Sequence, residues 1–345
     1  MFTLSSKAIQ DFFKTIGSLK ISNSSIPILE CVLIKVLNGT ITFTVSDLQT
    51  EVSHQIGKTD CENLQFCVEA KKIKELSKAP GYYVFTLEGS TVKINNYKLP
   101  IEDAEEFPLS YLNTNYSQVF LKQFECDLSV LSELANFVGK DDLRLAMTGI
   151  YFNGSKLCAT DAWRMRCVLL NCDSKANFVL AANTAKIVAK LGIVTVFTST
   201  ETVVFLNDTY RVKSRKIDAQ FPDYNSICPK SSNVGIELNR KEFLAKLKNC
   251  LPIVNKSTYQ VVLSISEQLT LIAKNSQWKT SLIETIPIKN QIGFLEIAFD
   301  CAFLIDIFSV LSGDTVFLQM STANKPLLIR ENGSKFLLMP VTIKD

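Results

Sequence analysis

The sequence predicts an α+β protein built from three tandem copies of one domain, each with two helices packed on antiparallel sheet. A short strand pattern that follows a polar turn occurs three times, and it ends at Asp47, Asp161 and Asn275. Both intervals between these residues are 114 residues long. A repeat this regular in a chain of 345 residues indicates three domains of similar length.

Two polar stretches separate the copies. They are Asn113–Ser117 and Ser231–Gly235, and neither shows the apolar periodicity of the segments around it. The predicted domains are therefore 1–115, 116–232 and 233–345.

The first copy begins with an amphipathic helix. Apolar residues at i, i+3, i+4 and i+7 mark one helix face, which starts after Ser5 or Ser6 as N-cap and stops at Gly17. This stripe consists of Ile9, Phe12, Phe13 and Ile16. Apolar and polar residues then alternate on both sides of an Asn-Gly pair, which predicts a β-hairpin. The other predicted elements are strands Cys31–Leu37 and Ile41–Ser46 with a turn at Asn38-Gly39, a helix at Ala70–Lys78, and strands Tyr83–Leu87 and Thr91–Lys98.

The second copy is predicted to repeat this order. Its first helix has an apolar stripe that ends at Gly139, and its hairpin turns at Asn153-Gly154. The stripe is Phe124, Leu128, Leu131, Leu134 and Val138. The later elements are a helix at Thr184–Leu191 and strands Val194–Thr198, Thr202–Leu206 and Tyr210–Lys216.

The third copy carries the clearest helix starts. Asn239 with Glu242 three residues later has the spacing of a capping box, and a second helix is predicted after Asp300. The apolar residues are Phe243, Leu244, Leu247 and Leu251 in the first helix and Phe303, Leu304, Ile307 and Phe308 in the second. The strands are predicted at Thr315–Met320, Pro326–Arg330 and Lys335–Val341.

Composition and motifs argue against an enzyme. The only histidine, His54, lies in an alternating strand pattern, so a Ser-His-Asp triad or a histidine-rich metal site is not expected. The ten cysteines are scattered without a Cys-x-x-Cys pair, which favours reduced structural thiols. There is no glycine-rich phosphate loop. We therefore expect no active site, no cofactor and no metal.

The sequence also argues against a membrane partner. No apolar run approaches the ~20 residues that cross a bilayer, and no secretory signal is evident. The expectation is a soluble, cytoplasmic protein.

Basic helices recur in all three copies. For any one helix, a solvated surface is a sufficient explanation of its lysines. Their recurrence instead favours a track for phosphates, which requires charge but no base-reading residues. The residues are Lys71, Lys72, Lys74 and Lys78, then Lys186 and Lys190, then Arg240, Lys241, Lys246 and Lys248. The net charge of +3 alone would not indicate a nucleic-acid partner.

Six short segments, in order along the whole chain, resemble the bacterial sliding clamp family, the beta subunit of the replicative DNA polymerase III. The segments are Ile26-Pro27-Ile28-Leu29-Glu30, Ser46-Asp47-Leu48, Glu106-Phe107-Pro108, Ala159-Thr160-Asp161-Ala162-Trp163-Arg164, Ile217-Asp218-Ala219-Gln220-Phe221-Pro222-Asp223-Tyr224 and Met339-Pro340-Val341. The resemblance implies the DNA-clamp fold and a head-to-tail homodimer, which forms a ring of six domains around duplex DNA. It also implies a non-catalytic role in DNA replication, in which the clamp tethers the polymerase for processive synthesis.

The resemblance further implies three sets of functional residues. A pocket between domains 2 and 3 would take peptides from the polymerase catalytic subunit, the clamp loader and repair proteins. Its residues would be Met147, Thr160, Ala162, Trp163, Arg164, Met165, Pro222, Ser226, Ile227, Leu337, Leu338, Met339, Pro340, Val341 and Thr342. DNA-binding residues would be Asn23, Lys71, Lys72, Lys74, Arg144, Lys186, Lys190, Arg240 and Lys241. The dimer interface would use Phe107 of one subunit and Leu251 and Ile253 of the other.

The chain departs from the family pattern within the expected pocket. Ala162-Trp163-Arg164-Met165 stands where Gly-His-Arg-Leu is usual, Ser226 replaces a frequent arginine, and the C-terminal segment is altered. These departures indicate a divergent member, and they keep a second hypothesis open. In that alternative, the chain is a clamp-fold interaction module from a phage or mobile element, which acts in the host cytoplasm. It would bind clamp-partner peptides or the loader without encircling DNA.

Overall fold

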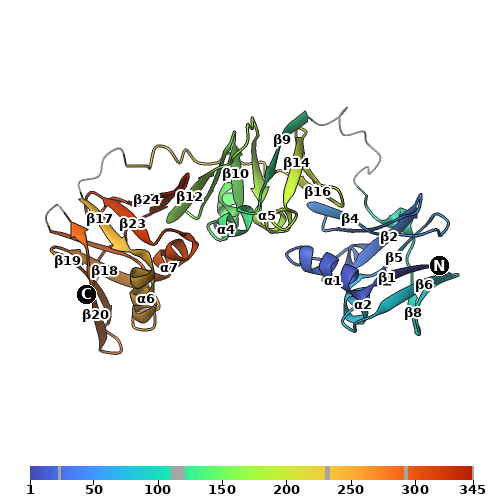
Figure 1. The fold of residues 1–345 in the computed structure, drawn as a ribbon, viewed down its shortest axis with the longest axis horizontal. Helices are drawn as coiled ribbons and strands as arrows, with labels where there is room; N and C mark the ends of the chain where they lie inside the picture. Colours follow the sequence, from blue (N-terminus) through green and yellow to red (C-terminus); the bar gives the residue numbers. More distant parts are fainter. Residues whose placement is uncertain (22–24, 110–120, 230–233, 291–293, 344–345) are drawn as a thin grey trace. The chain divides into compact units, whose positions relative to one another are not determined.

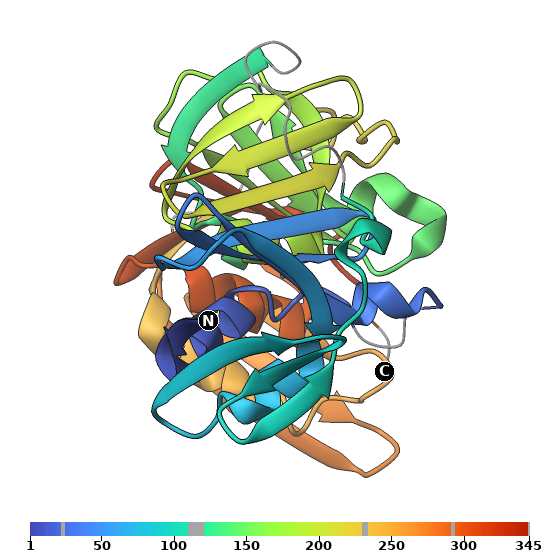
Figure 2. The same cartoon turned by 90° about the vertical axis from the view of Figure 1, so that its right-hand side faces the viewer.

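The computed structural model describes residues 1–21, 25–109, 121–229, 234–290 and 294–343 (Figures 1 and 2). It contains mostly antiparallel sheets with few helices, which confirms the α+β prediction. The chain divides into two compact units. Unit 1 comprises Met1–Ala135, Phe152–Ser155 and Asn171–Ala219, and unit 2 comprises Asn136–Tyr151, Lys156–Leu170 and Gln220–Asp345.

Unit 1 holds two antiparallel sheets. The smaller sheet has the strand order β1-β6-β7-β8, and the larger has the order β5-β2-β3-β4-β16-β15-β14-β9. The strands are β1 (Phe2–Ser5), β2 (Cys31–Leu37), β3 (Thr40–Ser46), β4 (Thr50–Lys58), β5 (Leu64–Glu69), β6 (Tyr82–Glu88), β7 (Thr91–Ile94), β8 (Tyr97–Pro100), β9 (Leu121–Asp127), β13 (Asn177–Ala181), β14 (Ile193–Thr198), β15 (Thr202–Leu206) and β16 (Tyr210–Arg215). The helices are α1 (Ser6–Thr15), η1 (Pro27–Glu30), α2 (Ala70–Leu76), η2 (Ala104–Glu106), α4 (Leu131–Leu134) and α5 (Ala182–Val188).

Unit 2 is built on the same plan. Its larger sheet contains, in order, β11-β12-β25-β24-β23-β17-β21, and its smaller sheet has the order β20-β19-β18-β22. The strands are β10 (Gly149–Asn153, which begins in this unit), β11 (Lys156–Thr160), β12 (Arg164–Leu169), β17 (Val234–Asn239), β18 (Gln260–Ile265), β19 (Gln268–Asn275), β20 (Thr280–Pro287), β21 (Lys289–Asn290), β22 (Leu295–Asp300), β23 (Thr315–Met320), β24 (Leu327–Glu331) and β25 (Ser334–Leu338). The helices are η3 (Asp142–Thr148), α6 (Arg240–Cys250) and α7 (Cys301–Val310).

Strand pairing joins the predicted copies to one another. In unit 1, β4 of the first copy pairs with β16 of the second, from His54 opposite Tyr210 to Thr50 opposite Ser214. In unit 2, β12 of the second copy pairs with β25 of the third. Each copy therefore shares a sheet with the next, so the compact units cut across the copies. The boundaries at 115 and 232 stay a prediction, and Asn113–Ser117 lies outside the described residues.

The helix caps predicted from the sequence are confirmed. The Ser5 hydroxyl accepts a hydrogen bond from the Ala8 amide (3.2 Å) at the start of α1. The Asn239 side chain accepts from the Glu242 amide (2.9 Å), and Asp300 accepts from two amides of α7. These side chains satisfy donors that the first helical turn leaves unpaired, so local sequence determines where the helices start.

Three sequence predictions of local structure are wrong. Phe124 lies in strand β9, and α4 spans only Leu131–Leu134, because pairing with β14 holds the segment extended. The segment 91–98 is a hairpin rather than one strand, since Asn95 turns the chain with a φ of 52°. The last strand stops at Leu338, beyond which Val341 forms only an isolated bridge to Ala298.

His54 is a packed strand residue, as predicted. Its ring stacks on Tyr210 (3.9 Å between centroids) and faces Phe12 of α1 (6.1 Å). Its Nδ1 is buried and has no hydrogen-bond partner in the described part of the chain. Burial lowers the pKa of His54 from 6.5 to about 4, although Asp11 acts in the opposite direction. The folded protein therefore holds this imidazole neutral down to about pH 4.

The neutral state of His54 predicts a pH-dependent stability. Between pH 6.5 and about 4 the unfolded chain binds the proton more tightly. The free energy of unfolding should therefore fall by up to about 1.4 kcal/mol per pH unit as pH drops through this window. Because the chain has one histidine, its imidazole signal in a proton NMR titration is unambiguous. We expect a midpoint near pH 4 and loss of this component in His54→Phe. A midpoint near 6.5 would contradict the packing described here.

Candidate partner-binding and nucleic-acid sites

The loop between β11 and β12 is held by its own polar side chains. The Asp161 carboxylate accepts hydrogen bonds from the amides of Trp163 (3.0 Å) and Arg164 (2.8 Å). The Thr160 hydroxyl accepts from the Ala162 amide and donates to the Arg164 carbonyl. This turn forces Ala162 to a φ of 76°, a left-handed conformation that costs a residue with a Cβ roughly 1 kcal/mol or more. As a result, Trp163 is 58% exposed, whereas Arg164 turns inward.

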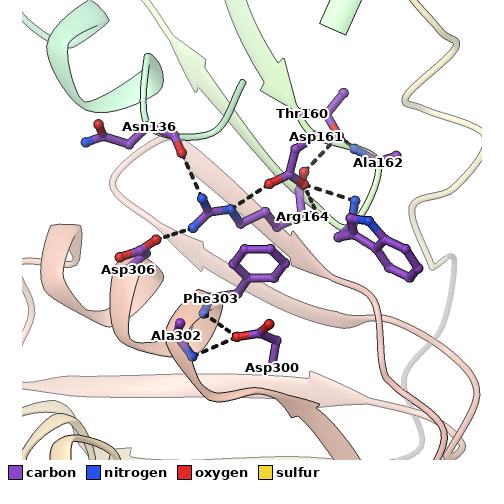
Figure 3. A network of polar contacts seen from close by, with 10 residues as sticks. Asn136, Thr160, Asp161, Ala162, Arg164, Asp300, Ala302, Phe303 and Asp306 are labelled. Carbon is purple, nitrogen blue, oxygen red and sulfur yellow. Dashed lines mark hydrogen bonds and ion pairs between the residues drawn. The ribbon is translucent and has the colours of Figure 1, made fainter. Parts of the chain in front are cut away.

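Arg164 is buried and is the centre of a polar network (Figure 3). Its Nε lies 3.0 Å from Asp161, and its Nη1 lies 2.5 Å from Asp306 of α7. Its Nη2 donates to the Asn136 carbonyl at 2.9 Å. The guanidinium also lies over the rings of Phe303 (4.3 Å) and Phe137 (5.0 Å). Arg164 therefore ties β12 to α7 and to the segment that follows α4. Its predicted contact with a peptide stays a prediction.

The other predicted pocket residues divide by burial. Met165, Leu337 and Leu338 are at most 2% exposed, and Thr160 is 5% exposed, so they support the surface rather than form it. The residues with exposed or half-buried side chains are Met147, Ala162, Trp163, Pro222, Ser226, Ile227, Met339, Pro340, Val341 and Thr342. All of the predicted pocket residues belong to unit 2.

A main-chain contact connects the central loop to the C-terminal segment. The Met339 amide donates to the Trp163 carbonyl at 2.8 Å, and the Val341 amide donates to the Ala298 carbonyl at 2.8 Å. Ser226, where the family often has arginine, donates its hydroxyl to the Asp223 carbonyl (2.7 Å) within its own turn. Trp163 and Met339 are thus adjacent, as the pocket prediction requires.

The predicted DNA-binding residues differ in their exposure and in their contacts within the protein. The side chains of Lys71, Lys72, Lys74, Arg144 and Lys186 are exposed. Lys241 is exposed but pairs with Asp314 at 2.9 Å. Asn23 lies outside the described residues.

Two of the predicted DNA-binding cations donate hydrogen bonds to carbonyls at helix ends, and their role in DNA binding stays a prediction. Lys190 donates to the carbonyls of Lys14 and Thr15, and Arg240 donates to those of Phe308 and Gly313. These carbonyls lie at or just beyond the C-termini of α1 and α7, where a cation is electrostatically favoured. Both side chains therefore stabilise the protein itself.

Phe107, predicted at a dimer interface, is buried within its own chain. It is 3% exposed and packs in a cluster with Cys31, Leu33, Cys67 and Ala104. Leu251 and Ile253, which follow α6, are half-buried. A Phe107→Arg variant would disrupt this cluster whether or not a dimer forms, so it does not test association.

The remaining chemistry of the described residues is limited. All ten cysteines are free, and burial raises the pKa of both Cys67 and Cys301 to about 12. No group of three or more potential ligands among His, Cys, Asp and Glu could hold a metal in the ranges that the structure describes. Within the same ranges, no helix is long and apolar enough to span a membrane.

The polar network around Arg164 predicts that lysine cannot replace this arginine without a loss of stability. Arg164→Lys keeps the charge but loses the planar fork that reaches three acceptors, so we expect a loss of about 2–4 kcal/mol in the free energy of unfolding. The matched control is Arg144→Lys, because Arg144 forms an exposed pair with Asp141 at 3.9 Å. Urea titration of both variants is the measurement. Equal midpoints for the two variants would show that the network contributes little.

Comparison with known proteins gives a consistent result. Residues 225–341 match the family model described as DNA polymerase III beta subunit, C-terminal domain. The beta sliding clamp of Chlamydia pneumoniae is 24% identical and is matched over 100% of this chain and 99% of its own length. That of Vibrio cholerae is 22% identical, over 98% of this chain and 97% of its own.

Solved structures share the fold over the whole chain. The DNA polymerase III beta subunit of Thermotoga maritima superposes with a TM-score of 0.88 at 21% identity, and 99% of each chain is covered. A sliding clamp from Bartonella birtlesii bound to griselimycin gives a TM-score of 0.88 at 23% identity, again over 99% of each chain. These matches confirm the clamp fold. Together with the full-length relatives, they show that the chain is similar over its whole length to beta sliding clamps, and its C-terminal part matches the DNA polymerase III beta subunit family model.

Proposed function

We propose that the chain is a DNA sliding clamp, a ring that encircles duplex DNA and tethers a polymerase for processive synthesis. The proposal is supported by full-length similarity to proteins named beta sliding clamp and by the shared fold. Such a clamp contributes topology rather than catalysis, so it requires neither cofactor nor active site. It acts where DNA is replicated, at the nucleoid in the cytoplasm of a bacterial cell.

The observation that carries ring closure is a pair of unused strand edges. At the first junction, β4 follows the β2–β3 hairpin of the first copy and pairs antiparallel with β16, the last strand of the second copy. At the second junction, β12 follows the β10–β11 hairpin of the second copy and pairs antiparallel with β25, the last strand of the third copy. The strands left over by this rule are β20 of the third copy and β8 of the first, and each lies at the end of its sheet. Two chains that paired β8 with the partner's β20 at both junctions would form a closed ring of six copies.

Exposed lysines on the helices support binding to the DNA backbone. Lys71, Lys72 and Lys74 project from α2, and Lys186 projects from α5. Contacts of this kind neutralise phosphates without reading bases, as a ring that slides along DNA requires. We assign to these four residues the main contribution of unit 1 to DNA binding.

The surface around Trp163 is the proposed site for partner peptides of the polymerase catalytic subunit and the clamp loader. Trp163 and Ile227 expose large apolar surfaces, and Met339 adjoins Trp163 through the main chain. An apolar surface with a methionine suits several hydrophobic peptides. Trp163 would determine which of them fit, since it stands where the family usually has histidine.

One observation favours the alternative of a clamp-fold module that does not encircle DNA. Lys190 and Arg240 are bonded to carbonyls at helix ends, so fewer cations remain for DNA than the family pattern implies. Under this alternative the chain would still bind clamp-partner peptides or the loader, but it would not form a ring.

Ring closure predicts that one exposed edge residue controls association. Ile283 is 63% exposed on β20, and a lysine on an edge strand opposes pairing. Ile283→Lys should convert a dimer into a monomer in sedimentation equilibrium. The control is Phe317→Lys on β23, which is 49% exposed and belongs to an interior strand of its sheet. A monomeric wild-type protein at all concentrations would favour the alternative.

A ring that encircles DNA should be retained differently on closed and on cut DNA. Once loaded on closed circular DNA, the protein should survive a high-salt wash and be released when the circle is cut. Purely electrostatic binding would be lost from circular and linear DNA alike as salt rises. Retention should also depend on the lysines of α2, so Lys71→Glu with Lys74→Glu should reduce loading severalfold. Equal salt-sensitive loss from both DNA forms would exclude the clamp function.

A further inference from the structure

The smaller sheet of unit 2 has a buried face and an outer face. Its strands follow the order β20-β19-β18-β22 (Figure 1). Leu263 of β18, Leu271 of β19 and Ile297 of β22 are buried, like the other odd-numbered residues inside these strands. Because side chains alternate along a strand, the even-numbered residues of the three strands project from the outer face.

The strand register aligns five apolar residues across the outer face. Ile283 of β20 lies opposite Ile272 of β19, which lies opposite Val262 of β18. Val262 lies opposite Ala298 of β22, and Ala298 forms a bridge with Val341. We call these five residues the apolar row. Ile283 is 63% exposed and Ala298 is buried, whereas the other three are half-buried. A line of apolar side chains therefore crosses the strands of this sheet.

Polar residues border the apolar row on both sides. On one side, Thr270 lies opposite Ser264, and Ser264 lies opposite Glu296. On the other side, Lys274 lies opposite Ser281. Glu296 and Lys274 are both exposed. The row thus has a carboxylate on one border and an ammonium group on the other.

The spacing of the apolar row matches one face of an α-helix. Neighbouring strands lie ~4.8 Å apart, so apolar side chains follow one another along the row at about that interval. A helix with apolar residues at every third or fourth position presents one of them per turn, at a pitch of ~5.4 Å. An extended segment fits less well, because its side chains on one face recur only every ~6.7 Å. The row therefore favours a helix that lies across the strands.

One end of the apolar row adjoins the segment that we assign to partner peptides. The Val341 amide donates to the Ala298 carbonyl, and the Met339 amide donates to the Trp163 carbonyl, both at 2.8 Å. Main-chain contacts thus connect the row to the surface around Trp163. All of these residues belong to unit 2. A protein bound at that surface can reach the row with the residues that adjoin its bound segment.

We propose that the apolar row binds an amphipathic helix of a partner protein, which lies across β18, β19 and β20 with its apolar stripe on the row. Basic residues along one border of the helix face Glu296, and acidic residues along the other border face Lys274. The proposal rests on the proposed function only in assigning the helix to a protein that also occupies the surface around Trp163. Two linked contacts then bind that partner more tightly than either contact alone.

The test uses a fluorescein-labelled, alanine-rich helical peptide. It has leucines at every third or fourth position, lysines along one border of that stripe and glutamates along the other. Fluorescence anisotropy should show saturable binding to the full-length protein. A peptide with serines in place of the leucines should bind at least tenfold more weakly. A peptide with a central proline, which keeps the leucines but breaks the helix, should be weakened to a similar extent.

Matched variants locate the binding. Ile272→Ser combined with Val262→Ser should weaken binding of the helical peptide at least tenfold. The control is Val84→Ser, which makes the same kind of change at a half-buried position on β6 of unit 1 and should leave binding unchanged. If the serine pair impairs folding, Ile272→Thr with Val262→Thr should give a smaller loss in the same direction.

Two further variants separate the charged border and the neighbouring surface. Lys274→Glu should weaken binding severalfold, because both borders are then acidic, whereas Lys93→Glu at an exposed position on β7 should not. Trp163→Ala should leave binding of this isolated helix unchanged. A failure of the apolar row is therefore distinguishable from a failure of the proposed peptide surface.

Three results would overturn the proposal. The first is no saturable binding of the helical peptide by the folded wild-type protein. The second is equal binding of the helical and the proline-containing peptides, which would indicate apolar contact without a helix. The third is a change of oligomeric state in Ile272→Ser, measured by sedimentation equilibrium, which would make the row part of an interface between copies of this chain.

Discussion

Main-chain pairing between strands of different sequence copies is the constraint on which the rest of the structure depends. Each copy supplies one strand edge to the next, at β4–β16 and at β12–β25. Unpaired strand edges are unfavourable when buried and prone to association when exposed, so each junction stabilises both of its members. The same pairing rule leaves over β8 and β20, each at the end of its sheet, and these are the edges that we propose pair with a second copy.

The side chains at each junction are adapted to that pairing. At the first junction, His54 and Tyr210 stack across β4 and β16, and burial keeps the imidazole neutral. At the second, Arg164 begins β12 and reaches Asp306 on α7 of the next copy. A buried guanidinium is tolerable only because three acceptors and two aromatic rings replace its water. The loop that carries Trp163 is thus anchored by the residue that also holds the junction.

The sequence predicted features that depend on a few neighbouring residues. The caps at Asn239 and Asp300 are local, and both were predictable. The strand position of Phe124 was not predictable. Its spacing to Leu128 and Leu131 matches the period of a helix, although the segment contains a strand and a turn. Nothing near Arg164 in the sequence indicates Asp306, which lies 142 residues away. The burial of Phe107 likewise depends on distant partners such as Cys31 and Cys67. The family motifs predicted the fold, but they did not predict which cations bind carbonyls of the protein itself.

The central claim is that β8 and β20 are edges completed by a second copy. Amide hydrogen exchange measured over a range of protein concentrations tests it most directly. The amides of Tyr97–Leu99 and of β20 should gain protection as concentration rises through dimer formation. Those of β1, at the other end of the β8 sheet, should not change. Dimer formation without added protection in β8 and β20 would contradict the account.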